Sequence, residues 1–371
     1  MNSSFIVKKF VLFCVFIGLP LVNIYHSITG SVFFNMEIEG AKGLEKFANH
    51  LLVPSRYLFA GQKVAIKNRD GKQICEIKQH YNYEIRFGAR TIASLCAFPI
   101  ATPLGLTLKA LSFIDSRSLN RHKIARSCLN SFHVNSNIAY YQSIGIDTSH
   151  YLEGETSECQ HHKRRPGDSD LMKADQIALK KIMQVLNKHN LIFWLDTGTC
   201  LGAYRYGGVI PWDFDVDIAI LEPDFRNVKN ALNELDKSKY VVQDWSGRDF
   251  PETYLKVYVK ESHSLIDIYH FKIHPKDQTL TSIVSNEKSI ILSEKWKWRE
   301  RRYKVPTPIS YVFPLKKGEF DGLQVPIPNQ TVKYLQLRYG DNLDPNCIYN
   351  ELTRDYEKDE SHPYWALEYA H

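Results

Sequence analysis

The clearest pattern of apolar and polar positions lies in the second half of the chain. From Ala178 to Leu186, apolar residues recur at the spacing of one helical face, and Asp168 to Asp170 can cap that helix. The elements that follow are predicted as a strand at 191–195, a turn and short helix through Tyr204, an aspartate-bearing strand near 215–221, a helix at about 223–235, and strands at 253–259 and 264–271. This order predicts an α+β fold, a small mixed sheet flanked by helices.

The N-terminal part carries a different signal. Residues 10–25 are uncharged and follow Lys8 and Lys9. The run is near the short limit for a spanning helix, about 17 residues, and no small-residue cleavage site follows it. We therefore expect an uncleaved signal anchor over residues 1–29, with the lysines on the cytoplasmic side. A cleaved signal peptide and a buried core helix are the alternatives. A single-pass membrane protein is expected, in the Golgi or ER of a eukaryote or the inner membrane of a bacterium.

A second apolar run spans residues 91–114. Its one charged residue is Lys109, and Pro99 and Pro103 lie near its middle. It fits a re-entrant or membrane-surface segment, or a buried helical hairpin that the prolines break. The rest of 30–165 has no clear chemical signature, and 154–170 reads as a polar linker. The predicted division is an anchor at 1–29, a stem at 30–165 and a catalytic domain at 166–371.

The amino-acid composition excludes few classes of function. The 371 residues carry a net charge of +6 spread along the chain, which does not by itself indicate nucleic acid as a partner. Seven scattered cysteines form no CxxC pair, so neither a zinc ribbon nor a disulfide framework is indicated.

Three aspartates, Asp213, Asp215 and Asp217, alternate into the predicted strand. Alternate strand residues share a face, so the last two lie roughly 6.5 Å apart along one side. Oxygen ligands favour Mg²⁺ or Mn²⁺ over zinc. Asp267, between two isoleucines in a later strand, joins this site if the two strands are neighbours. Asp213 is either a turn residue or a further metal ligand.

Anion-binding features precede the acids. Gly198 and Thr199 open a turn into a helix, where exposed N–H groups bind phosphate readily. Arg205 follows and can add a charged phosphate contact. Lys256 is either another phosphate contact or a surface lysine. A phosphate-binding turn beside a metal-binding acid pair predicts a site for a nucleotide diphosphate.

These residues resemble a known signature. The stretch GTCLGAYRYGGVIPWDFDVDIAI, together with FPLKKGEFDGLQVPIPNQTVKYLQLRYGD at 313–341, is similar to the LicD family, which includes fukutin and the fukutin-related protein. The similarity covers about 175–340. It implies a nucleotidyltransferase-like fold and transfer of a phosphorylated alcohol, phosphocholine or ribitol phosphate, from a CDP-linked donor to a glycan or glycolipid.

The resemblance also implies roles. Gly198 and Thr199 would form the phosphate-binding turn, and Asp215 and Asp217 the metal pair. Asp267 would be the third carboxylate, a metal ligand or general base, and Arg205 matches the family's arginine. The sequence departs from the usual pattern at Cys200, Tyr206 and Phe214, and the last two bear on substrate specificity.

Two other classes of function stay open on the sequence. A glycosyltransferase can also hold a sugar nucleotide with an acidic pair and a metal, and a membrane-tethered protein can keep such a site for binding alone.

Overall fold

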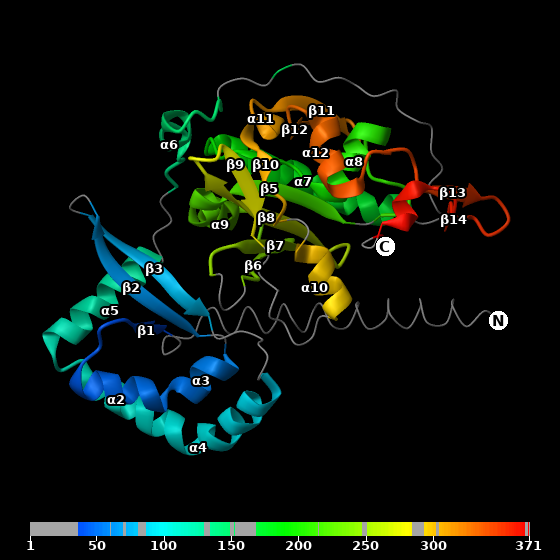
Figure 1. The fold of residues 1–371 in the computed structure, drawn as a ribbon. Helices are drawn as coiled ribbons and strands as arrows, with labels where there is room; N and C mark the ends of the chain where they lie inside the picture. Colours follow the sequence, from blue (N-terminus) through cyan, green and yellow to red (C-terminus); the bar gives the residue numbers. More distant parts are fainter. Residues whose placement is uncertain are drawn as a thin grey trace. The chain divides into compact units, whose positions relative to one another are not determined.

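The computed structural model describes residues 36–59, 61–69, 72–80, 87–129, 134–148, 152, 168–213, 215–246, 251–283, 293–301, 304–367 and 370. The chain forms two compact units. The first comprises Met1–Phe132, Trp245–Glu252 and Ser285–Ser293; the second comprises His133–Asp244, Thr253–Val284 and Glu294–His371 (Figure 1). The predicted anchor at 1–29 and most of the predicted linker lie outside the described residues.

The first unit combines a small sheet with helices. Its elements are β1 (Met36–Ile38), α2 (Gly43–Leu51), α3 (Val53–Leu58), β2 (Gln62–Arg69), β3 (Lys72–His80), α4 (Phe87–Ser112) and α5 (Ser116–Leu129). The sheet order is β1-β2-β3, with β1 parallel and β3 antiparallel to β2. The predicted hairpin over 91–114 is wrong, because α4 is one helix with Pro99 and Pro103 inside it.

The second unit holds the predicted helices and strands in the predicted order, with further elements between and after them. They are α6 (Ile138–Ser143), α7 (Asp168–Lys188), β4 (Phe193–Leu195), α8 (Thr197–Tyr206), β5 (Val216–Leu221), η2 (Glu222–Asp224), α9 (Phe225–Ala231), η3 (Leu232–Glu234), β6 (Tyr240–Asp244), β7 (Tyr254–Val259), β8 (Ser264–His274), β9 (Thr279–Ser282), α10 (Glu294–Arg301), β10 (Thr307–Pro308), α11 (Ile309–Val312), β11 (Lys316–Phe320), β12 (Leu323–Ile327), α12 (Thr331–Tyr339), β13 (Cys347–Asn350), β14 (Asp355–Lys358) and η5 (Pro363–Ala366). The prediction of an α+β fold with a mixed sheet and flanking helices is confirmed.

The main sheet of this unit has seven strands, in the order β10-β9-β8-β5-β4, with β7 paired to both β8 and β6. Only β5 and β8 pair in parallel among these strands. The first part of β8 lies between β5 and β7, and its last residues pair with β9. This central place of β8 decides which side chains meet at the site.

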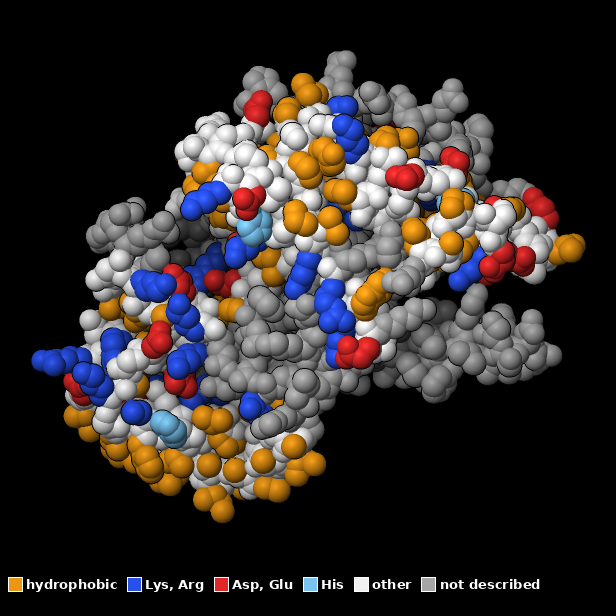
Figure 2. Space-filling model, viewed as in Figure 1, with side chains coloured by type: hydrophobic (Ala, Val, Ile, Leu, Met, Phe, Trp, Pro, Cys, Tyr) orange, Lys and Arg blue, Asp and Glu red, His pale blue; other side chains and the backbone are white. Residues whose placement is uncertain are grey.

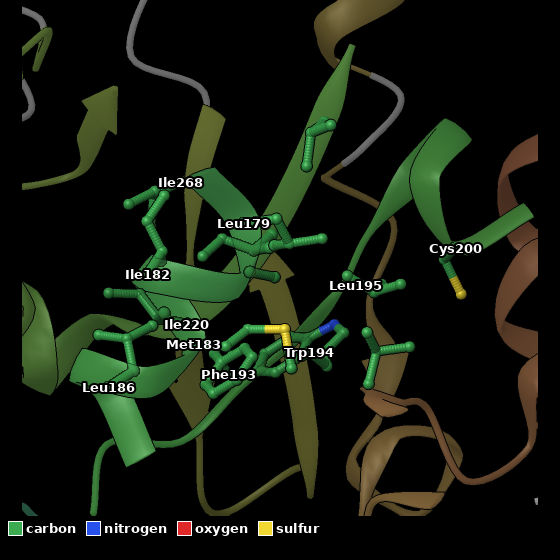
Figure 3. Packing of buried hydrophobic residues seen from close by; sticks show 14 of the residues in the cluster. Leu179, Ile182, Met183, Leu186, Phe193, Trp194, Leu195, Cys200, Ile220 and Ile268 are labelled. Carbon is green, nitrogen blue, oxygen red and sulfur yellow. The ribbon is translucent and has the colours of Figure 1, made fainter. Parts of the chain in front are cut away.

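A single apolar core holds the sheet against α7. Ile182 and Leu186 are fully buried on the helical face that the sequence predicts, and they pack near Phe193 and Trp194 of β4 (Figure 3). All six residues of β5 are buried, Asp217 among them. Burial of apolar surface on this scale is the main favourable term in folding, so β5 and β8 form a rigid base for the carboxylates.

The second unit begins earlier than the predicted boundary at residue 166. Tyr141 and Ile146 are buried in its core. The Tyr141 hydroxyl donates to Asp224 Oδ2 at 2.7 Å, and Asn137 Nδ2 donates to Asp224 Oδ1 at 2.6 Å. Residues 134–148 are therefore part of this unit, although they have too few periodic apolar positions to indicate it in the sequence.

Candidate active site

The two aspartate-bearing strands lie side by side. Asp217 is directly opposite Asp267 in the parallel β5–β8 ladder, where neighbouring strands are about 4.8 Å apart. Asp215 comes immediately before β5, and Asp213 two residues earlier. The condition under which Asp267 joins the site, that its strand is a neighbour of the first, is therefore met.

The first turn of α8 is joined to β5 by two threonines. Asp196 caps the helix by accepting from Thr197 N at 2.8 Å. Thr197 Oγ1 donates to Asp217 Oδ2, and Asp217 N donates to Thr199 Oγ1 at 2.7 Å. The predicted Gly-Thr turn thus lies beside the carboxylates, and the Thr199 hydroxyl is engaged with the β5 backbone.

Gly198 permits a close approach by Asp213. A Cβ atom at residue 198 would lie 2.6 Å from Asp213 Oδ2, closer than real Cβ contacts come. The other oxygen, Oδ1, accepts from Asp215 N at 3.4 Å, as in a turn. Asp213 is therefore both a turn residue and a neighbour of the phosphate-binding turn that the sequence predicts.

Burial and neighbouring carboxylates raise the pKa values of Asp215 and Asp217. Burial, followed by the charges of Asp267 and Asp215, raises the pKa of Asp217 well above its ordinary value. Burial around the group, followed by Asp213 and Asp267, raises the pKa of Asp215 to about 6. The Asp215 side chain is nevertheless exposed to solvent, so its charge is screened more than that of Asp217. The cluster is short of positive charge.

Lys256 supplies part of that charge. Its Nζ lies 2.8 Å from Asp267 Oδ1 and 3.0 Å from Oδ2, and the Tyr254 hydroxyl donates to Oδ2 at 2.6 Å. Lys256 faces Asp267 because the two are paired across β7 and β8. The sequence leaves open whether this lysine is on the surface; the structure places it in the site. Alternation along β7 could have indicated its face, but not its partner strand.

The Arg205 guanidinium binds the protein backbone. Its side chain is buried, with Nε donating to the Leu343 carbonyl and Nη2 donating to the Asp344 carbonyl at 2.5 Å. These bonds tie α8 to the segment before β13. The geometry therefore gives Arg205 a structural task and does not support the predicted phosphate contact.

A buried network behind the site was not predicted. The Tyr334 hydroxyl donates to Asp196 Oδ1 at 2.5 Å and accepts from Trp194 Nε1 at 3.1 Å. The Arg338 guanidinium lies 4.1 Å from the centre of the Tyr334 ring, and Arg338 Nε is 3.8 Å from Asp196. The network joins α12 to the cap of α8, so the two distant sequence motifs meet in one buried cluster.

The donor atoms suit a hard divalent cation. The cluster offers carboxylate oxygens, the ligands that Mg²⁺ and Mn²⁺ prefer. Burial, followed by the neighbouring carboxylates, raises the pKa values of Asp215 and Asp217, and a bound cation would offset both effects. Within the part of the chain that the structure describes, no three acidic, histidine or cysteine side chains are arranged as a ready ligand set. The fit is therefore one of chemistry and charge, and ligation requires these side chains to turn.

Known proteins share this part of the chain. The family model of the LicD/FKTN/FKRP nucleotidyltransferase domain matches residues 190–330, which contain the whole aspartate cluster. This part of the chain is similar to the LicD family. The ribitol 5-phosphate transferases FKRP of Mus musculus and Homo sapiens are each 27% identical over 173 residues, covering 45% of this chain and 31% of the relative. The uncharacterized protein RP689 of Rickettsia prowazekii (strain Madrid E) is 27% identical over 164 residues, covering 43% and 52%.

The chain spans about a third of the length of each FKRP relative. The structure shows where two of the residues that depart from the usual LicD pattern lie. Cys200 is fully buried in the core, where it replaces one apolar residue with another. Tyr206 is also buried, with its ring centre 6.2 Å from that of Trp212. Phe214 lies outside the described residues.

Proposed function

We propose that the LicD domain transfers a phosphorylated alcohol, similar to ribitol phosphate or phosphocholine, from a CDP-linked donor to a glycan or glycolipid. The observation that carries the proposal is the pairing of Asp217 with Asp267 beside the first turn of α8. The names of the FKRP relatives support ribitol phosphate as the first candidate group.

Asp215 and Asp217 would hold Mg²⁺ or Mn²⁺, with Asp213 completing the set. The cation would neutralise charge on the donor diphosphate as it breaks. The first turn of α8, at Gly198 and Thr199, would bind phosphate oxygens through backbone N–H groups. Arg205 has no role in this proposal, because its guanidinium already binds the backbone of Leu343 and Asp344.

In the proposed reaction an acceptor hydroxyl oxygen bonds to the phosphorus that carries the alcohol, and the bond from that phosphorus to CMP breaks. CMP leaves with the bonding electrons, and the hydroxyl proton goes to Asp267. A positioned base of this kind contributes typically 10²–10⁴-fold. Lys256 holds Asp267 in place and compensates its charge in the half-buried site.

The test is CMP release by the full chain in detergent, with Mg²⁺ or Mn²⁺, a glycan acceptor and a panel of CDP-ribitol, CDP-choline, UDP-sugars and GDP-sugars. We expect turnover only with CDP-alcohols. Asp215→Asn and Asp217→Asn should each reduce it by about 10³-fold or more, with an unchanged circular dichroism spectrum. Asp277→Asn, at an exposed turn between β8 and β9, is the matched control.

The same panel separates the alternatives. Turnover with a UDP- or GDP-sugar would indicate a glycosyltransferase. No turnover, combined with calorimetry that detects neither Mg²⁺ nor CDP binding, would indicate a binding protein with a relic site. Full activity of both aspartate variants would show that the assigned site is wrong.

A further inference from the structure

Helix α4 buries its polar side and exposes its apolar side, the reverse of a surface helix in a water-soluble protein. Ser94, Thr102, Lys109 and Ser112 are buried, and these positions recur at helical spacing along one side. The opposite side exposes large apolar residues, with Ile100 78% exposed and Ile92 65% exposed. A helix on the surface of a water-soluble protein turns its apolar side inward, so α4 is built for a different surrounding.

Helices α2 and α3, which pack against α4, show the same reversal. Glu45 and Asn49 of α2 and Arg56 of α3 are buried, while Phe47 of α2 is 58% exposed. Three neighbouring helices therefore share one polarity. We call their exposed side the outward apolar face; it includes Phe47 and, on α4, Ile92, Leu95, Ile100, Leu104 and Leu111.

Ion pairs and hydrogen bonds hold the inner side together. Lys109 Nζ lies 3.1 Å from Glu45 Oε1 and donates to Asn49 Oδ1 at 2.9 Å. Glu45 Oε2 accepts from Ser118 and from Arg121, each at 2.7 Å. Proteins in lipid place polar residues inside and apolar residues outside, because the protein interior supplies the hydrogen-bond and ion-pair partners that lipid cannot.

The surrounding charge indicates which occupant fits this face. Residues 91–114 contain no acidic residue. Exposed Arg90 comes just before them, and exposed Asp115 and Arg117 follow, with Arg121 and Lys123 further along α5, so basic residues outnumber acidic ones on these flanks. Exposed Lys46 is next to Phe47 on α2. Figure 2 shows the apolar side chains gathered along one edge of the first unit, with Lys and Arg side chains beside them. A second copy would bring the same positive border, which repels, whereas anionic lipid head groups attract it.

We propose that the outward apolar face lies in one leaflet of an anionic lipid bilayer, with α4 in the plane of the membrane. The segment Ala89–Ser112, 24 residues, is long and apolar enough to cross a membrane. It nevertheless packs along its polar side onto α2 and α3, which are short and bear Glu45 and Arg56. An in-plane position buries only the outward side, to a depth of about 5–10 Å. This membrane contact is independent of the predicted anchor at 1–29.

The test uses the full chain in vesicles of phosphatidylcholine and phosphatidylserine that contain a trace of lipid with a photoreactive acyl chain. Trypsin cuts after Arg90 and Lys109 and releases peptide 91–109, which mass spectrometry then scores for lipid adducts. We expect at least tenfold more adduct on 91–109 than on peptide 339–354, which bears Leu352, 96% exposed in the second unit. Labelling should fall in vesicles of phosphatidylcholine alone.

A variant sharpens the result. Ile100→Glu combined with Leu104→Glu should reduce labelling of 91–109 at least tenfold and leave labelling of the tryptic peptide 10–42 unchanged. Ile177→Glu, at an exposed apolar position on α7, is the control and should change neither. Equal labelling of 91–109 and 339–354 in the unsubstituted chain would overturn the proposal. So would crosslinks from 91–109 to a second copy in place of lipid.

Discussion

At the residue scale, the aspartates of the site oppose the stability of the fold that holds them. Asp217 lies in a fully buried strand, beside Asp267 and with Thr197 donating to it. Its pKa is raised because burial and the neighbouring carboxylates disfavour its charge. Such a group is retained for chemistry and not for folding.

Asp217→Asn should therefore stabilise the protein while abolishing activity. Between the ordinary aspartate pKa and the raised one, the folded state binds more protons than the unfolded state, so the stability of the unsubstituted protein falls as pH rises. In EDTA at pH 7.5 we expect the variant to melt roughly 2–6 °C higher, with the gap closing towards pH 4. A lower melting temperature at pH 7.5 would contradict this account. Asp215→Asn should show a smaller gap, because Asp215 is exposed.

Metal affinity should depend on pH in the same range. Protons compete with a cation for carboxylates, and the pKa of Asp215 is raised to about 6. Calorimetry with Mn²⁺ should show affinity falling steeply, by about tenfold per pH unit or more, below pH 6. Affinity that stays constant from pH 5 to 7.5 would place the metal elsewhere.

At the element scale, the packing of α8 depends on two glycines, because a side chain at either position would collide with a neighbour. Gly198 faces the Asp213 carboxylate, and Gly202 faces the backbone carbonyl of Gly208. The Asp213 carboxylate is the end of a side chain and can turn away from residue 198. The Gly208 carbonyl is part of the backbone and cannot move away from residue 202 in this way. The two glycines of one motif therefore have different tasks, which the spacing of the motif does not reveal.

Gly198→Ala should displace the Asp213 carboxylate at little expense in stability, with a melting temperature within about 2 °C of the original. If Asp213 binds metal, Mn²⁺ affinity and turnover should fall about tenfold or more, because one ligand is moved. Gly202→Ala should instead destabilise by about 1–3 kcal/mol or more through overpacking. Unchanged Mn²⁺ affinity in Gly198→Ala would leave Asp213 as a turn residue only.

At the scale of the whole molecule, the second unit includes residues 134–148, a segment that the sequence motifs did not indicate. Asp224 has no exposed surface, and Tyr141 and Asn137 bind both of its oxygens. Asn227 Nδ2 also donates to Asp224 Oδ1, at 2.7 Å. A chain that begins at residue 150 keeps that hydrogen bond but lacks the two from Tyr141 and Asn137.

A chain that begins at residue 134 should therefore melt several degrees higher than one that begins at 150, since breaking buried hydrogen bonds to a charged group costs about 1–3 kcal/mol each. Differential scanning calorimetry of the two fragments measures this. A matched substitution, Tyr141→Phe in the full chain, removes one hydrogen bond and should produce a smaller decrease. Equal melting temperatures for the two fragments would show that residues 134–148 add nothing to the second unit.

The sequence by itself determined the features that depend on neighbours along the chain. The helical face through Ile182, the Asp215–Asp217 alternation and the turn at Gly198 follow from local periodicity and backbone preference, and the motifs identified the family. Only the tertiary structure decided that β8 lies parallel to β5, that Lys256 meets Asp267, that Arg205 binds a distant backbone, and that α4 faces outward with its apolar side. These depend on which surfaces are buried against one another, and residues tens to more than a hundred positions apart compete for that burial in a way that no local pattern records.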